Sequence, residues 1–157
     1  MINNKIPIIS IIIPTYNHAK FIKKALQSVI NQTFENWEAI VIDNYSTDDT
    51  EKILNEYKDT RIRYIKIKNN GIIAKSRNLG IENANGEWIA FLDSDDWWTL
   101  NKLETCFNNI DKKVDLIYHN LEVKYNKSKF NFENKFFKKK EFLKGRQLKK
   151  PILNDLL

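Results

Sequence analysis

The sequence predicts an α/β protein in which helices flank a mainly parallel central sheet. Three observations lead to this fold class: short apolar runs alternate with stretches of helical period, polar clusters follow several of the apolar runs, and 157 residues suit one domain. Hydrophobic residues make up 42% of the chain, which contains only 4 Gly and 3 Pro. That composition is typical of an ordered globular protein rather than a disordered or collagen-like chain.

The predicted elements alternate between strand and helix up to residue 119. Ile8–Ile13 is a buried apolar run, and apolar residues at positions 21, 22, 25, 26, 29 and 30 then have the spacing of an amphipathic helix. Asp48–Tyr57 is predicted as a helix because Ser46 or Thr47 can cap it and acidic residues occupy its first turn. The other predicted strands are Trp37–Ile42, Ile62–Ile67, Trp88–Leu92 and Val114–Tyr118, and the other helices are Ile72–Ala84 and Leu100–Ile110.

Composition and spacing exclude several function classes. The four glycines fit neither the G-x-G-x-x-G dinucleotide loop nor the P-loop. Cys106 is the only cysteine, so the chain has no intramolecular disulfide or Cys-rich metal site, and a reducing cytosolic setting fits best. The longest apolar stretch, Ile6–Ile13, contains Pro7 and Ser10 and is far shorter than the roughly 20 residues that span a bilayer. No clear cleavage site follows it, so a buried strand fits this stretch better than a signal peptide.

The positive charge is concentrated near the C-terminus. Residues 112–150 carry 13 Lys and Arg against 4 Asp and Glu, whereas residues 1–111 carry 13 against 15. This asymmetry indicates an anionic partner, and a solvated lysine-rich face explains it equally well. The 22 Lys and 4 Arg argue against specific nucleic-acid recognition, which depends on Arg. Beyond residue 119 the pattern weakens to a candidate strand at Leu121–Tyr125 and a candidate helix at Lys138–Gly145.

Polar clusters follow three of the predicted strands. They are Thr15–Asn17 after the first strand, Asp43–Ser46 after the second and Asp93–Asp96 after the fourth. In open α/β sheets, ligands bind outside the carboxyl ends of the strands, near the point where strand order reverses. The three clusters therefore predict a binding site at this edge of the sheet.

The acidic cluster Asp93–Asp96 predicts a metal site. Carboxylates two residues apart at a strand end can converge on one hard cation such as Mg2+ or Mn2+, with water and phosphate completing the shell. Such a cation would offset the charge that builds on a departing phosphate. A cap and first turn for the next helix is an equally good explanation of the segment alone.

Three single residues near the other clusters are further candidates. Asp43 could accept hydrogen bonds from a base or a ribose, although an Asx-turn or a helix cap is its commoner use. Tyr16 could stack on a planar base. Arg77 could reach a phosphate with two hydrogen bonds, and a surface ion pair is its default explanation.

Taken together, these segments resemble the N-terminal half of family 2 glycosyltransferases over residues 6–119. Each matching segment is short, and their order and spacing make the resemblance specific. The segments are Ile9–Asn17, Asn31–Thr33 with Trp37–Glu38, Asp43–Thr50, Ala74–Gly80 and Gly86–Asp96.

The resemblance implies a fold of GT-A type whose N-terminal half, residues 1–119, binds a nucleotide-sugar, usually a UDP-sugar, together with Mn2+ or Mg2+. By position, Pro14, Thr15 and Tyr16 would line the base pocket, with Tyr16 against the uracil. Asp43 would hydrogen-bond the base edge, and Arg77 would help to hold the nucleotide.

The same resemblance identifies Asp93-Ser94-Asp95 as a DXD motif. Asp93 would lie toward the ribose or the metal, and Asp95 toward the metal and the diphosphate. The segment after the second strand departs from the family, which usually has Asp-Asp-Gly-Ser where this chain has Asp43-Asn44-Tyr45-Ser46. A carboxylate is lost and a bulky residue replaces Gly, so we expect an altered nucleotide affinity or preference.

The largest departure from the family lies after the DXD motif. The family's second half carries the acceptor pocket and the general base of an inverting transfer, but only 62 residues follow Asp95. None of the late carboxylates, Glu133, Glu141 and Asp155, forms the paired acidic motif of the family, so the sequence identifies no general base. Residues 120–157 are expected to be the lysine-rich, incomplete start of the acceptor half of a truncated chain.

The expected function is that of an inverting, hexosyltransferase-like enzyme of bacterial polysaccharide biosynthesis. It would transfer a sugar from a nucleotide-sugar to a polysaccharide or lipid-linked acceptor, with metal-assisted departure of the nucleotide. We expect it in the cytoplasm at the inner face of the membrane, with residues 112–150 as the contact and no specific nucleic acid as partner. The alternative is a nucleotide-sugar-binding module that lacks the general base.

Overall fold

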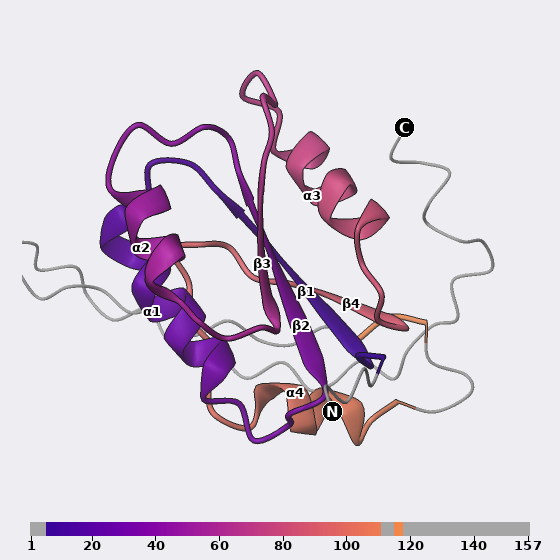
Figure 1. Ribbon diagram of the computed structural model, residues 1–157. Coiled ribbons are helices and arrows are strands. Elements are labelled where there is room, and N and C mark those ends of the chain that lie inside the picture. Colours follow the sequence, from indigo (N-terminus) through magenta and orange to yellow (C-terminus); the bar gives the residue numbers. More distant parts are fainter. Residues whose placement is uncertain (1–5, 111–114, 118–157) are drawn as a thin grey trace, which may run out of the picture. The chain divides into compact units, whose positions relative to one another are not determined.

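The computed structural model describes residues 6–110 and 115–117, and its elements follow the predicted alternation of strand and helix (Figure 1). The strands are β1 (Ile9–Thr15), β2 (Trp37–Asp43), β3 (Ile62–Lys66) and β4 (Trp88–Phe91). The helices are α1 (Ala19–Ile30), α2 (Thr50–Glu56), α3 (Ile73–Glu82) and α4 (Lys102–Phe107). Helix α4 is shorter than the predicted Leu100–Ile110.

The predicted fifth strand is not found where the structure can test it. Residues 115–117 form a bend and irregular backbone, while Val114 and Tyr118 lie outside the described residues. The candidate strand Leu121–Tyr125 and the candidate helix Lys138–Gly145 also lie outside them, as does the proposed second segment, residues 120–157. The boundary at residue 119 therefore stays a prediction.

The four described strands form one parallel sheet in the order β3-β2-β1-β4. The chain adds β2 and β3 on one side of β1 and then crosses to add β4 on the other side, so the strand order reverses at β1. The register places Thr15 opposite Asp43, and Asp43 opposite Lys66. The loops that leave these strand ends are therefore neighbours.

Alternate residues of β1 pack against different helices. Ile11 and Ile13 belong to the main core, which includes Ile22 and Leu26 of the amphipathic helix α1. Ile12 points to the other side of the strand, where α3 lies in Figure 1. Gly80 lets α3 approach the sheet closely there, because a Cβ at this position would lie 2.4 Å from Ile12 Cγ2.

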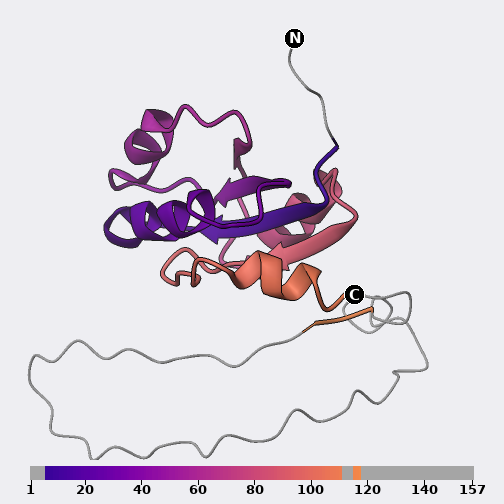
Figure 2. The same cartoon turned by 90° about the horizontal axis from the view of Figure 1, so that it is seen from below.

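Helix α4 is fastened to the segment that follows α1, and Figure 2 shows α4, in orange, from below. The buried Gln32 makes both connections: its Oε1 accepts from Leu103 N at 2.9 Å, and its Nε2 donates to Thr99 O at 2.7 Å. The rings of Phe34 and Phe107 pack at a centroid distance of 4.8 Å beside them.

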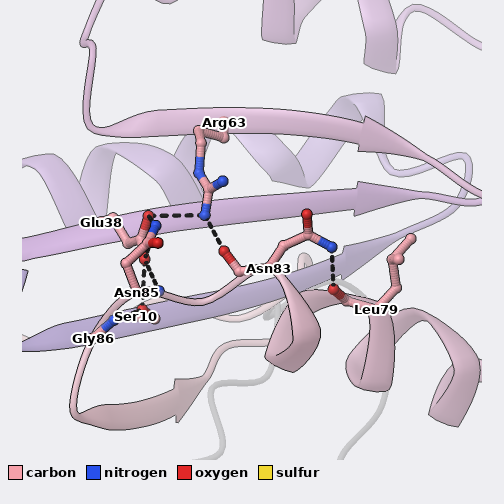
Figure 3. Close-up of polar contacts among 7 residues, drawn as sticks. All are labelled: Ser10, Glu38, Arg63, Leu79, Asn83, Asn85 and Gly86. Atoms are coloured by element: carbon pink, nitrogen blue, oxygen red, sulfur yellow. Dashed lines mark hydrogen bonds and ion pairs between the residues drawn. The ribbon is translucent and has the colours of Figure 1, made fainter.

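The amino edge of the sheet, where the strands begin, holds a polar network built around Glu38 (Figure 3). Glu38 Oε1 accepts from the Ser10 hydroxyl at 2.7 Å and from Asn85 N at 2.6 Å, and Oε2 pairs with Arg63 Nη2 at 2.9 Å. Gly86 N donates in turn to the Ser10 hydroxyl at 2.8 Å. This network fastens the connection between α3 and β4 to the first three strands.

The network also changes the acidity of Glu38, which is 8% exposed. Burial alone would raise the pKa of its carboxyl, but the hydrogen bonds from Asn85 and Ser10 and the charge of Arg63 together lower the pKa below the ordinary 4.5. The ionised form of Glu38 therefore stabilises the folded state.

Candidate functional site

The loops after β1 and β2 are bonded to each other at the carboxyl edge of the sheet. Asn17 N donates to Ser46 Oγ at 2.9 Å, and Asn17 Oδ1 accepts from Thr47 N at 2.7 Å. Asp48 Oδ2 accepts from Ala19 N at 3.0 Å. Burial alone would raise the pKa of Asp48, but the hydrogen bonds from Thr50 and from Ala19 N lower it. The two loops therefore form one braced unit.

Asp43, at the end of β2, is fully buried inside this unit. Its Oδ1 accepts from Ser46 N at 3.0 Å and from the Ser46 hydroxyl at 2.5 Å, and its Oδ2 accepts from the Tyr64 hydroxyl at 2.8 Å. Burial and then the bond to Asp43 raise the pKa of Tyr64. Asp43 thus stabilises the turn after β2, which was the alternative interpretation of this residue. Its contact with a base remains a prediction.

An open pocket of about 510 Å³ lies at the tips of the loops after β1, β2 and β3. Its size is within the usual range of small-molecule sites. The residues that line it are Tyr16, Asn44, Tyr45, Lys68 and Asn70. Of the predicted base-pocket residues Tyr16 is among them, whereas Pro14 and Thr15 are buried in β1 and do not line it.

Asn44 lines this pocket with its amide held by a neighbouring loop. Its Oδ1 accepts from Asn69 N at 2.9 Å, which fixes the orientation of the amide. The Nδ2 group is then the side left to face a ligand. Sequence reasoning noticed Asn44 only as a lost carboxylate, and it missed Lys68 and Asn70. The turn signature Asn69-Asn70-Gly71 after the third predicted strand was the available signal.

Left-handed backbone is concentrated around the pocket. All four positive φ angles in the described part of the chain occur here, at Asn17 (52°), Tyr45 (53°), Asn70 (55°) and Gly71 (79°). Asn and Gly adopt this conformation readily, but a bulky residue does so at a strain of about 1–2 kcal/mol. Tyr45 is therefore the strained member of the group.

Thr15 brings an unpartnered hydroxyl to the end of β1. The residue is 5% exposed, and its Oγ1 has no hydrogen-bond partner. Trp37 Nε1 and Arg63 Nε are unpartnered near the opposite edge, so an orphaned atom does not by itself mark a site. Thr15 differs from these two residues in its position. It is the last residue of β1, the strand at which the strand order reverses, and it directly precedes Tyr16.

The predicted DXD segment leaves the sheet next to β1, just after β4. Asp93 and Asp95 are exposed, while Ser94 between them is 2% exposed and bonded through Oγ to His18 Nδ1 at 2.6 Å. His18 precedes α1, so this bond holds the acidic loop against the loop after β1. Sequence reasoning missed His18, because nothing in the pattern linked it to a residue 76 positions away.

Arg77 of α3 reaches the same acidic loop. Its Nη2 lies 2.8 Å from Asp93 Oδ1 in a partly exposed ion pair, and its buried Nε has no partner. The structure therefore shows for Arg77 the ion pair that was its default explanation, and a contact of Arg77 with a phosphate remains a prediction.

The acidic loop carries concentrated negative charge. Partial burial, and then the charges of Asp95 and Asp93, raise the pKa of Asp96. Among the described residues no group of three or more His, Cys, Asp or Glu forms a complete cation site. Two exposed carboxylates fit a hard cation that takes its remaining ligands from phosphate and water. A metal at Asp93 and Asp95 remains a prediction.

Several predicted features cannot be located. Glu133, Glu141 and Asp155, and nearly all of the basic segment 112–150, lie outside the described residues. Within the described part, none of the helices combines the length and the apolar character needed to cross a bilayer.

A family model described as glycosyl transferase family 2 matches residues 10–156 of the chain. The chain belongs to glycosyl transferase family 2. This match confirms the family that the sequence segments indicated, and it extends well past the last residue that the structure describes.

Named relatives and a solved structure agree with this assignment. TuaG of Bacillus subtilis (strain 168), named as a glycosyltransferase of teichuronic acid biosynthesis, is 42% identical over 100 residues, which are 62% of this chain and 40% of TuaG. WfgD of Escherichia coli is named as a UDP-Glc:alpha-D-GlcNAc-diphosphoundecaprenol beta-1,3-glucosyltransferase. It is 42% identical over 97 residues, which are 62% of this chain and 38% of WfgD. The chain thus spans well under two thirds of the length of these relatives.

The structure of S. aureus TarS in complex with UDP has a TM-score of 0.63 with this chain and 34% sequence identity. The match covers 67% of this chain and 32% of the TarS 1–349 chain. The likeness confirms the α/β fold of GT-A type.

Proposed function

We propose that the described part of this chain binds the donor of an inverting glycosyl transfer: a UDP-sugar held with Mn2+ or Mg2+. One observation carries the proposal: the pocket beside Tyr16 and the acidic loop at Asp93–Asp95 flank the end of β1 on the same sheet edge. TarS, which is similar in fold and sequence, has been solved with UDP and with UDP-GlcNAc.

The pocket residues hold the nucleoside through different contacts. Tyr16 stacks on the base, and the Asn44 amide donates to a carbonyl oxygen of the base. The base-edge contact passes from Asp43 to Asn44 in this proposal, because both carboxylate oxygens of Asp43 are already bonded within the protein. Pro14 and Thr15, which are buried in β1, shape the end of the strand that carries Tyr16.

The acidic loop holds the diphosphate end of the donor. Asp93 and Asp95 are the metal ligands, and Asp93 also faces the ribose. When bound, the cation acts as a Lewis acid that offsets the charge on the departing nucleotide. Arg77, which pairs with Asp93 at 2.8 Å, would contribute its guanidinium to the diphosphate.

The reaction assigned to the whole enzyme is displacement at the anomeric carbon. An acceptor hydroxyl loses its proton to a base, attacks that carbon, and the bond to the phosphate oxygen breaks with the electron pair leaving on UDP. The acceptor class is a polysaccharide or lipid-linked glycan of bacterial envelope synthesis, for which the names of WfgD and TuaG give support. Residues 112–150 contact the inner face of the membrane through their positive charge.

A calorimetric titration of UDP into the 157-residue chain tests donor binding. We expect binding with Mn2+, its loss with EDTA, and weaker binding of ADP, because adenine has no carbonyl oxygen for Asn44. Asp95→Ala is expected to abolish the metal dependence, whereas Glu87→Ala removes an exposed carboxylate near the amino edge and should leave it intact. Metal-dependent binding that survives in Asp95→Ala would refute the DXD assignment.

Turnover separates the enzyme from the alternative, a binding module without a general base. Release of UDP from UDP-glucose or UDP-GlcNAc by the 157-residue chain would support the enzyme. Tight binding with no release would support the module.

A further inference from the structure

Tyr45 combines two unfavourable features in one residue. Its φ of 53° lies in the left-handed region, which bulky residues rarely adopt, and 56% of the residue is exposed to solvent. The ring therefore adds little to the apolar core that could offset the strain. Residues held in such a conformation cluster at functional sites, where the surrounding structure fixes them.

The surrounding bonds explain how the conformation is held. Ser46, the next residue, bonds to Asp43 through both its N–H and its hydroxyl, and its Oγ accepts from Asn17 N. The turn from Asp43 to Ser46 is thus closed on both sides of Tyr45. The side chain of Tyr45 is consequently presented at the pocket, together with Tyr16.

A cation supports the ring in this place. Lys66 Nζ lies 5.8 Å from the centre of the Tyr45 ring, and Glu51 holds the same ammonium at 2.6 Å. The distance is within the range of a cation–π contact. The ring is therefore oriented by its neighbours before any ligand binds.

We propose that Tyr45 is a nucleobase-binding residue that supplies, with Tyr16, the aromatic surface on which the nucleobase of a nucleoside diphosphate stacks. The inference rests on the proposed function and adds a residue to it. Stacking on a nucleobase is sequence-tolerant but requires a planar ring, so the contribution of Tyr45 depends on its aromaticity and not on its hydroxyl.

Three substitutions at the same position isolate the ring. Tyr45→Phe keeps the ring, Tyr45→Leu keeps an apolar side chain of comparable bulk and the backbone strain, and Tyr45→Asn removes the ring while relieving the strain. UDP and inorganic pyrophosphate, each with Mn2+, are titrated into the 157-residue chain and its variants. Thermal unfolding of each variant is followed in parallel.

We expect Tyr45→Phe to bind UDP within about twofold of the unsubstituted chain, and the Leu and Asn variants to bind it about tenfold more weakly. Pyrophosphate affinity is expected to stay unchanged in all three variants. The Asn variant should unfold at the same or a higher temperature than the unsubstituted chain, because Asn tolerates left-handed backbone.

The outcomes distinguish this inference from the proposed function. Equal UDP affinity of the Phe and Leu variants would overturn the role of Tyr45 while the donor site stands. A parallel loss of pyrophosphate affinity would also overturn it, since Tyr45 would then act only by shaping the loop. If the unsubstituted chain binds no UDP, both the proposed function and the inference fall.

Discussion

The two edges of the sheet differ in the burial of their carboxylates and in the conformation of their backbone. At the amino edge, the Glu38 carboxylate is buried and receives bonds from Ser10, Asn85 and Arg63. At the carboxyl edge, Asp93 and Asp95 are exposed, and every positive φ angle of the described residues occurs in the loops there. One edge contributes stability, and the other keeps exposed carboxylates and the strained backbone of Tyr45.

The difference follows from the parallel arrangement of the strands. The loops that leave the carboxyl ends of β1, β2 and β3 meet as neighbours, because the register aligns Thr15, Asp43 and Lys66. Changes to the amino edge should therefore alter unfolding and spare UDP binding, and changes to the carboxyl edge should do the reverse.

The largest expected effect on this comparison comes from Glu38→Ala. The substitution removes the carboxylate that Arg63 and the Asn85 N–H share, and among the described residues Arg63 keeps only its bond to Asn83 O, so we expect the free energy of unfolding to fall by about 2–3 kcal/mol. Urea denaturation measures this change, and calorimetry should find the UDP affinity unchanged. Weakened UDP binding in a variant of unaltered stability would break the comparison.

Gly86→Ala tests the same edge through packing. An added Cβ would lie 2.6 Å from Ser10 N and 2.8 Å from Ser10 Oγ, so backbone must move, and we expect a loss of about 1–3 kcal/mol in thermal unfolding. The control is Gly71→Ala at the other edge, where a Cβ meets nothing within 4 Å but φ is +79°. Its expected loss is about 1 kcal/mol, from backbone strain alone. Equal stability of Gly86→Ala and the unsubstituted chain would show that the α3–β4 connection is loosely held.

The pH dependence of the unfolding free energy tests the role of the ionised Glu38 carboxylate. Its folded pKa is lowered below 4.5, so its ionised form stabilises the fold above that pH, and the contribution is lost as pH falls from 4.5 toward the folded pKa. The difference in unfolding free energy between the unsubstituted chain and Glu38→Gln should therefore be constant near neutral pH and shrink below pH 4.5. A difference that is independent of pH throughout would contradict the lowered pKa.

The smallest expected effect is at the carboxyl edge, from His18→Ala. The substitution removes the partner of Ser94, and the freed acidic loop should bind UDP with Mn2+ about threefold more weakly, a difference of about 0.7 kcal/mol. Thermal unfolding should change by less than about 1 kcal/mol. His18→Gln, which retains a hydrogen-bonding side chain, should recover part of the affinity. A loss of stability with unchanged affinity would make His18 a residue of the scaffold.

Local pattern was sufficient to predict the four strands and four helices of the described residues and the sheet edge at which the polar clusters gather, but not the irregular backbone of residues 115–117. The apolar runs of β1 to β4 and the polar residues directly after them are visible without knowledge of contacts. Tyr16 lines the pocket because it immediately follows β1 at this edge, and its contact with a base stays a prediction.

The remaining contacts depend on the register of the strands, which the local sequence pattern does not show. The bond between Asp43 and Tyr64 joins residues 21 apart, and the one between Ser10 and Glu38 joins residues 28 apart. Asn44, Lys68 and Asn70 become neighbours only once β1, β2 and β3 are aligned. The left-handed backbone of Tyr45 was equally hidden, since the side chain itself disfavours that conformation.

The central position of β1 has a consequence for how the protein is made. Ile9 pairs with Trp37 on one side but with Trp88 on the other, so β1, which is synthesised before β2, β3 and β4, is among the last of these strands to be fully covered. Until β4 has been synthesised, one edge of β1 is open to pairing with other chains. The loops after β1, β2 and β3 can meet before that moment, whereas Asp93 and Asp95 join them only after β4 closes the sheet.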